Sequence, residues 1–415
     1  MKALLMSKKV PDRETMMGIF SDADTGSTLM GPPMNKRSRI DDANYEIENR
    51  LETLITRLGD STAEDHSKSL QEHMNTLNKH LDDLAQLLES DLNDHKNFIL
   101  RILVLCAYQL PHKCAVYTTL VGLINVKNYN AGSELVELLI KELEEMIHTE
   151  QWDSARWIVR FICDLVNSNV VSPQSVIMFL ESLLDVVQED GYHWVRKDYY
   201  ALCVLSALPW CGQELYNRND TRPEFEEILA VLEQYVDSDE RKRQMHKWRE
   251  LLGVWKVDSP HLQEEQLHLL MQQINTMRNN SWQERFLLRP YLAFKEALED
   301  ALQHDIPPFE PPVDSVTTNY PIPKIQLRMF DLNDVPDPNG PILPGPRSIE
   351  RYIIDEQLEQ IMTAFEKDRK SCAEKLLNLP GGNRIPIQTM IVEMLFSLMY
   401  KLPQAAHVEA AYLNF

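Results

Sequence analysis

The sequence predicts an all-α protein, an α-solenoid built from antiparallel helical hairpins. Apolar residues recur at three- and four-residue steps along most of the chain, the pattern of a helix with one buried face. The expected turns are spaced so that each pair of helices takes up roughly 40 residues, the repeat length of helical-hairpin solenoids. No region alternates apolar and polar residues as a half-buried strand does.

Residues 1–40 lack apolar periodicity, and we expect them to form a disordered tail. Residues 41–303 read as a first helical-repeat domain. Its expected helices carry apolar stripes at 47–58, 70–88, 98–106, 115–126, 135–146, 157–166, 176–187, 199–208, 224–236, 240–253, 264–277 and 284–303. Turns are expected at Gly59, Pro111, Gly132, 172–173, Gly191 and Gly212, where glycine supplies a positive φ and proline begins a helix. The helix at 199–208 is expected to end before Pro209.

Proline density marks the end of this domain. Between Asp305 and Pro346 lie eleven of the 23 prolines, which excludes a helix and predicts an extended linker at 304–346. Part of the linker, from Tyr320 on, is apolar enough to pack against a domain. Helical periodicity resumes after Ser348, a good N-cap, with further helices at about 372–377 and 389–400. Residues 347–415 therefore read as the start of a second domain that is incomplete.

Charge limits the kind of ligand that the chain binds directly. The 415 residues contain 42 Lys and Arg against 63 Asp and Glu, a net charge of −21. Such an acidic chain repels bare phosphate backbone, so any role with RNA depends on a local basic patch or on a partner. The six cysteines form no CxxC pair and predict buried free thiols. No apolar run approaches the ~18–20 residues of a membrane span, so we expect no membrane association.

No catalytic or cofactor-binding motif is found. The sequence has no phosphate loop, GxGxxG, HExxH or GxSxG. Histidines 66, 73 and 80 share a seven-residue spacing, which marks one polar helix face more often than a metal site. We therefore expect no catalytic, cofactor-binding or metal-binding residue.

Two basic clusters are candidate sites. The first cluster, at 36–39, consists of Lys36, Arg37 and Arg39 around Ser38. It lies in the predicted tail, where an importin could reach it. The cluster is therefore either a nuclear import signal or a basic tetrad that occurs by chance. The second cluster lies on a predicted helix and could meet RNA phosphates or an acidic partner helix; the alternative is a solvated face that balances nearby carboxylates. Its members are Arg241, Lys242, Arg243, Lys247 and Arg249.

Several stretches in order resemble one family. The most characteristic sequence is that of residues 114–132, CAVYTTLVGLINVKNYNAG. Further similar blocks lie at 51–55, 160–167, 205–210, 282–294, 301–309, 328–331, 344–345 and 348–351. In these blocks the chain resembles the large subunit of the nuclear cap-binding complex, a MIF4G-type helical-repeat protein.

The resemblance implies a scaffold and not an enzyme. In that family a small RRM-type subunit grips the RNA cap, so capped RNA is bound indirectly. The large subunit docks factors of mRNA processing, splicing, export and nonsense-mediated decay. Import by importin, nuclear localisation and shuttling to the cytoplasm are also implied. Members of the family have three such domains. Sequence similarity to the family ends here after Pro403, so we expect a chain that is truncated within its second domain.

Three other functions remain open at this point. The chain could be a general helical-repeat adaptor with no cap-related role. It could be a truncated form that no longer binds the small subunit. An enzyme whose site is assembled from distant helices is the third.

Overall fold

The computed structural model describes residues 39–60, 70–189, 193–251, 263–283, 287–312, 320–321, 324–327, 347–363, 369–377 and 391. Most of these residues are helical; the exceptions are an extended segment at 301–312, shorter connections and two three-residue strands, so the predicted all-α class is confirmed. The helices are α2 (Arg39–Thr56), α3 (Leu70–Gln109), α4 (Cys114–Lys127), α5 (Tyr129–His148), α6 (Trp152–Asp164), α7 (Pro173–Gln188), α8 (Trp194–Asn217), α9 (Arg222–Val236), α10 (Asp239–Leu251), α11 (Gln266–Asn279), α12 (Lys295–Glu299), α13 (Ile349–Thr363) and α14 (Arg369–Leu377). Short 3-10 helices lie at Pro111–Lys113, Leu165–Ser168 and Pro290–Phe294.

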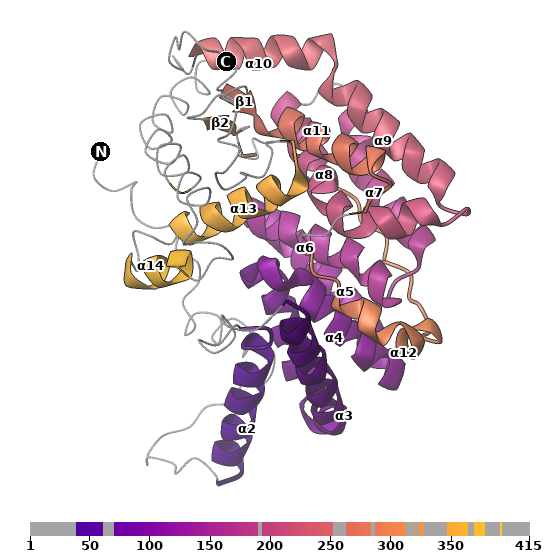
Figure 1. Cartoon of the computed structure of the whole chain (residues 1–415), viewed down its shortest axis with the longest axis vertical. Coiled ribbons are helices and arrows are strands. Elements are labelled where there is room, and N and C mark those ends of the chain that lie inside the picture. Colours follow the sequence, from indigo (N-terminus) through magenta and orange to yellow (C-terminus); the bar gives the residue numbers. More distant parts are fainter. Residues whose placement is uncertain are drawn as a thin grey trace, which may run out of the picture. The chain divides into compact units, whose positions relative to one another are not determined.

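From Glu48 onward the chain forms one compact unit, described here by itself. Neighbouring helices pack in sequence from α3 to α6, and α8 packs against α6 and α7 (Figure 1). Helices one step removed also touch, α3 with α5, α4 with α6 and α7 with α9. Such contacts are those of stacked helical repeats, in which each unit buries its apolar face against its neighbours.

Helix α4 is the centre of this core. All of its residues from Cys114 to Asn125 are buried, and a helix that is apolar on all sides is enclosed by its neighbours. Its bounds match the predicted 115–126 within two residues, and Pro111 begins the 3-10 turn that leads into it. Gly59 has a φ of +75°, which confirms the predicted turn after α2.

Gly132 does not turn the chain, contrary to the prediction. Asn128 caps α5 by accepting a hydrogen bond from the backbone N–H of Ala131, and Gly132 lies inside that helix. A Cβ at this position would lie 2.1 Å from Oδ1 of Asn125 and 2.9 Å from Nε2 of His304. Glycine is required because two other segments approach the helix closely.

Two further expectations about α8 are wrong. The helix continues through Pro209 and Gly212 to Asn217. Gly212 packs against the fully buried ring of Trp282, whose nearest atom would be 2.4 Å from an added Cβ. Close packing therefore explains this glycine, and burial against neighbours compensates for the backbone hydrogen bond that Pro209 cannot make.

Helix lengths also differ at two places. The stripes predicted at 70–88 and 98–106 belong to one 40-residue helix, α3, which is kinked at His95 (φ −123°, ψ 20°). The single helix predicted at 284–303 is instead the 3-10 turn Pro290–Phe294 followed by the five residues of α12. Pro290 lacks a backbone N–H and so prevents a continuous helix there. Gly191, Gly253 and nearly all of the helix predicted at 389–400 lie outside the described residues.

The Pro-rich segment is extended and packs along the helices where it is described. His304 forms a parallel bridge with Val171, and its backbone oxygen accepts a hydrogen bond from Ser172. Phe309 is buried beside Phe179, with ring centroids 6.0 Å apart. Further on, β2 (Ile325–Leu327) pairs antiparallel with β1 (Gln263–Glu265), a contact that the sequence pattern did not predict.

After the Pro-rich segment, Ser348 caps α13 by accepting a hydrogen bond from the N–H of Arg351, as predicted. The boundaries of the four predicted regions stay a prediction. Among the described residues no single helix has the length and hydropathy of a membrane span, and α3 and α4 would meet both only as a pair bent by 105°.

Candidate docking surfaces

The basic cluster of α10 is only partly on the surface. Arg241 is 4 % exposed and its guanidinium donates hydrogen bonds to both carboxylate oxygens of Asp198, at 2.8 and 2.9 Å. The same guanidinium lies 2.8 Å from a carboxylate oxygen of Glu265, which caps α11. Arg241 therefore ties α10 to α8 and α11, and its predicted place on a surface is wrong.

The other members of this cluster keep their predicted exposure where their side chains are described. Lys242, Arg243 and Lys247 are exposed, and Lys242 lies 3.3 Å from Asp237, also on the surface. The side chain of Arg249 lies outside the described residues, as do Lys36 and Arg37 and the side chain of Arg39. A contact role for the exposed lysines and Arg243, and an import role for the tetrad, stay predictions.

A buried ionic cluster joins α6 to α13. The guanidinium groups of Arg156 and Arg160, 4 % and 1 % exposed, donate to the carboxylate of Glu356 at 2.5, 2.6 and 2.8 Å. The hydroxyl of Tyr352 accepts from both arginines, at 3.1 and 3.2 Å. We call these four residues the α6–α13 cluster.

The electrostatics of the α6–α13 cluster favour the ionised carboxylate. Burial alone would raise the pKa of Glu356, but the attraction of Arg160 and Arg156 outweighs it and lowers this pKa to about 2. Two cations thus share one anion in a nearly closed site. No spacing rule connects residues about 200 positions apart, so the sequence contained no signal for this pairing.

The extended segment has a second anchor at Tyr320. This side chain is 9 % exposed, and its hydroxyl accepts a 2.6 Å hydrogen bond from Arg196. Its ring lies 4.6 Å from Trp152 and 5.7 Å from Tyr199, measured between centroids. The prediction that this part of the linker packs against a domain is confirmed.

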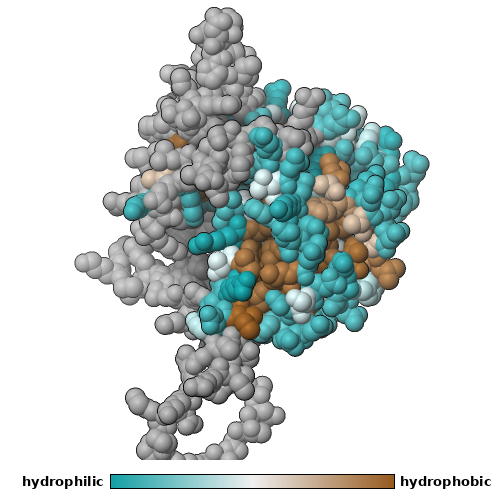
Figure 2. Space-filling model, turned by 60° about the horizontal axis from the view of Figure 1, so that its bottom comes forward, coloured by the Kyte–Doolittle hydropathy of each residue, from teal (hydrophilic) through white to brown (hydrophobic). Residues whose placement is uncertain are grey.

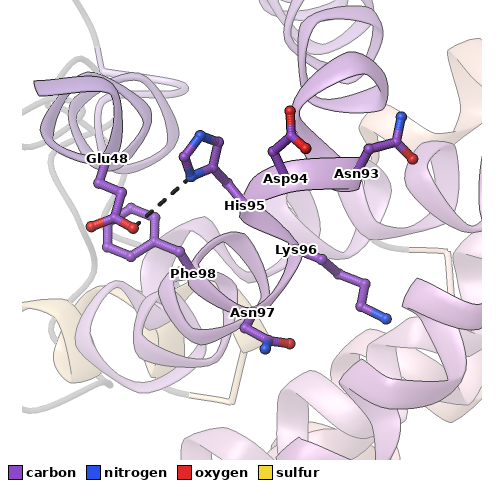
Figure 3. Close-up of a pocket in the computed structure, with 7 residues that line it drawn as sticks. All are labelled: Glu48, Asn93, Asp94, His95, Lys96, Asn97 and Phe98. Atoms are coloured by element: carbon purple, nitrogen blue, oxygen red, sulfur yellow. Dashed lines mark ion pairs between the residues drawn. The ribbon is translucent and has the colours of Figure 1, made fainter. Parts of the chain in front are cut away.

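A small cavity of about 280 Å³ lies at the kink of α3. His95 faces Glu48 across it, with Nδ1 and Oε1 3.9 Å apart (Figure 3). Asn93, Asp94 and Lys96 also line it but point in different directions. Since these polar groups do not converge, the cavity lacks the arrangement expected of a catalytic or ligand site.

The described residues contain no group of three or more His, Cys, Asp or Glu side chains placed to hold a metal ion. His73 and His80 fall within this part of the chain, whereas His66 lies outside it. The six cysteines are free and buried, as predicted.

Figure 2 shows hydrophobic residues gathered between hydrophilic areas on one face. Large apolar side chains are exposed at the junction of α4 and α5, where Val126 is 40 % and Tyr129 44 % exposed. Leu302, 69 % exposed, belongs to the same neighbourhood, because its backbone oxygen accepts a 2.9 Å hydrogen bond from Asn125. Exposed apolar groups that lie together are typical of surfaces that bind other proteins.

Comparison with known proteins agrees with this architecture. The MIF4G domain matches residues 67–281, about half of the chain. The chain is 42% identical to nuclear cap-binding protein subunit 1 of Xenopus tropicalis over 382 residues, 92% of this chain and 46% of the relative. It is 42% identical to the Gallus gallus protein of that name over 390 residues (94% and 46%), and 41% to the Homo sapiens protein over 382 residues (92% and 46%). The chain thus spans about half the length of the relatives it matches.

Proposed function

The chain belongs to the MIF4G domain family, and we propose that it serves as the scaffold subunit of a nuclear RNA cap-binding complex. One observation carries the proposal: 41–42% identity, over more than nine tenths of this chain, to proteins named nuclear cap-binding protein subunit 1. The resemblance that the sequence blocks indicated is confirmed by these matches. The described structure supports a scaffold, since its stacked helical repeats present broad surfaces.

The proposed mechanism is indirect. A net charge of −21 disfavours direct binding of RNA phosphates, so a small RRM-type subunit would hold the cap itself. The scaffold would order mobile segments of that subunit beforehand. Ordering in advance removes part of the entropic cost of cap binding and raises the apparent affinity of the complex.

The wider role follows from the same proposal. Factors of mRNA processing, splicing, export and nonsense-mediated decay would dock on exposed surfaces such as the apolar neighbourhood of Val126, Tyr129 and Leu302. The protein would act in the nucleus, enter it through importin and shuttle to the cytoplasm, and it would catalyse no reaction.

Retention on a cap-analogue resin tests the proposal. The purified chain should be retained only when the small RRM-type subunit is present, and free cap analogue should release both proteins. A matched sample with the unmethylated nucleotide as competitor should leave the complex on the resin. If the resin holds the small subunit but never this chain, the chain is a general adaptor or a form that does not bind the small subunit, and the proposal is wrong.

A further inference from the structure

Leu302 is the most exposed large apolar side chain among the described residues, at 69 %. Its backbone oxygen accepts a 2.9 Å hydrogen bond from Nδ2 of Asn125, the residue before the exposed Val126. Two positions after Leu302, the ring of His304 lies 4.2 Å from that of the exposed Tyr129, measured between centroids. Two segments far apart in the sequence thus build one apolar surface. We call Val126, Tyr129 and Leu302 the Leu302 patch.

The backbone on both sides of Leu302 is held in place. Before it, the backbone oxygen of Leu298 accepts a 2.9 Å hydrogen bond from Nδ2 of Asn169. After it, the N–H of His304 donates to the backbone oxygen of Val170 at 2.8 Å. These bonds fix the segment on the helices, so the exposed leucine has a defined position on the surface. An apolar side chain on a preorganised backbone binds with a small entropic cost, which suits it as an anchor for a partner.

The surroundings of Leu302 are acidic. No described residue forms an ion pair with Glu299 or Asp300. Lys127, next to Val126, does not offset them, because its Nζ already lies 3.4 Å from a carboxylate oxygen of Glu89. Four carboxylates face one lysine among the exposed charged residues within seven positions of Leu302, which are Lys295, Glu296, Glu299, Asp300 and Asp305.

We propose that the Leu302 patch docks a basic segment of a partner protein, in which one or two large apolar side chains lie between arginines or lysines. The apolar side chains would cover the patch, and the cations would pair with Glu299 and Asp300. Charge disfavours two other occupants. A second copy of this chain would bring the same carboxylates together across a two-fold interface, and RNA would bring phosphates to them. The inference rests on the proposed scaffold function and specifies the chemistry of its partner.

Fluorescence anisotropy with the full chain and a labelled peptide, GRRLWLRRG, tests the proposal. The chain should bind this probe about tenfold more tightly than either GEELWLEEG or GRRSSSRRG, which keep only the apolar or only the basic residues. Added salt should weaken binding, since it screens the attraction between the arginines and the exposed carboxylates. The probe carries no cap and the small subunit is absent, so failure here is distinct from failure on the cap-analogue resin.

Two pairs of variants assign the binding to the patch. Leu302→Ser should weaken binding of the probe about tenfold, whereas Met178→Ser, which changes a 63 % exposed residue of α7, should leave it within about twofold. Glu299→Gln/Asp300→Asn should also weaken it about tenfold. Its control is a double variant of α5 that removes the same charge from an exposed face, Glu144→Gln/Glu145→Gln, which should stay within about twofold of the wild type.

Three results would overturn the proposal. The first is equal affinity of the three peptides, and the second is an equal loss of affinity in Leu302→Ser and Met178→Ser. The third is a dimer of the wild type in sedimentation velocity that Leu302→Ser dissociates, because a second copy would then cover the patch. All substituted side chains are exposed, so unchanged thermal melting should accompany each variant.

Discussion

Replacing Glu356 with glutamine should release α13 from α6. The carboxylate is 10 % exposed and accepts hydrogen bonds of 2.5–2.8 Å from two arginines, so its loss leaves both cations without their buried counter-charge. Breaking such a pair costs about 3–5 kcal/mol. The same two arginines lower the pKa of Glu356 from 4.5 to about 2, which corresponds to a stabilisation of about 3 kcal/mol.

Hydrogen exchange measured by mass spectrometry is the suitable assay, because it reports local opening of α13 apart from global unfolding. A loss of about 3 kcal/mol corresponds to exchange on the order of 100-fold faster at amides 352–360. The effect should depend on pH. A carboxylate with a lowered folded-state pKa stabilises the fold above its unfolded pKa of about 4.5, and this contribution disappears as the pH falls through 4.5 toward 2. The difference between variant and wild type should therefore be about 1 kcal/mol smaller at pH 4 than at pH 7.

Asp153→Asn is the matched control, since this carboxylate also lies near Arg156 but is 58 % exposed. Its replacement should cost less than about 1 kcal/mol. Exchange of α13 in the Glu356→Gln variant within threefold of the wild type would refute the reasoning, because it would mean that the ionic cluster does not hold this helix.

Four further outcomes are expected. Gly132→Ala should lower the free energy of unfolding by about 1–3 kcal/mol in thermal denaturation, because its methyl group would overlap Asn125; an unchanged melting temperature contradicts the close approach. Arg241→Met should cost about 3–5 kcal/mol and Lys242→Met less than about 1 kcal/mol, so equal losses would argue against the difference in burial. Burial lowers the pKa of His304 below 6.5, so the unfolded chain binds a proton at a higher pH than the folded chain does. The stabilisation by neutral His304 is therefore lost as the pH falls below about 6.5. In urea unfolding, the difference in free energy of unfolding between the wild type and His304→Gln should decrease between pH 7.5 and 5.5. The chain alone should bind no cap analogue in fluorescence titration, and micromolar affinity would contradict this expectation, which rests on the net charge of −21.

Local patterns were sufficient to predict most helices. The run around Val116–Ile124 is apolar on all sides, and the predicted ends of α4 lie one residue inside the observed ones. Periodicity reports which residues are buried, but a kinked helix and two separate helices produce the same stripe, as in α3.

Glycine and charge were misread where the reason lies in a distant segment. The sequence pattern predicts turns at Gly132 and Gly212, whereas both glycines lie inside helices because Asn125 and Trp282 approach them closely. The charged run around Arg241 predicts an exposed side chain, whereas Asp198, 43 residues away in the sequence, pairs with Arg241 inside the fold. The α6–α13 cluster was missed for the same reason, since nothing near Arg160 in the sequence indicates Glu356.

The long separation of the arginine pair from Glu356 also has a consequence during synthesis. About 200 residues separate them along the chain, and ribosomes add about 5–20 residues per second. Helix α6 therefore leaves the ribosome roughly 10–40 s before α13 does, long enough for the helices around it to form. During that interval the nascent protein exposes two oriented guanidinium groups beside Trp210. The α6–α13 cluster therefore forms only after Glu356 has been synthesised, so the packing of α13 on α6 is a late event in the folding of the nascent chain.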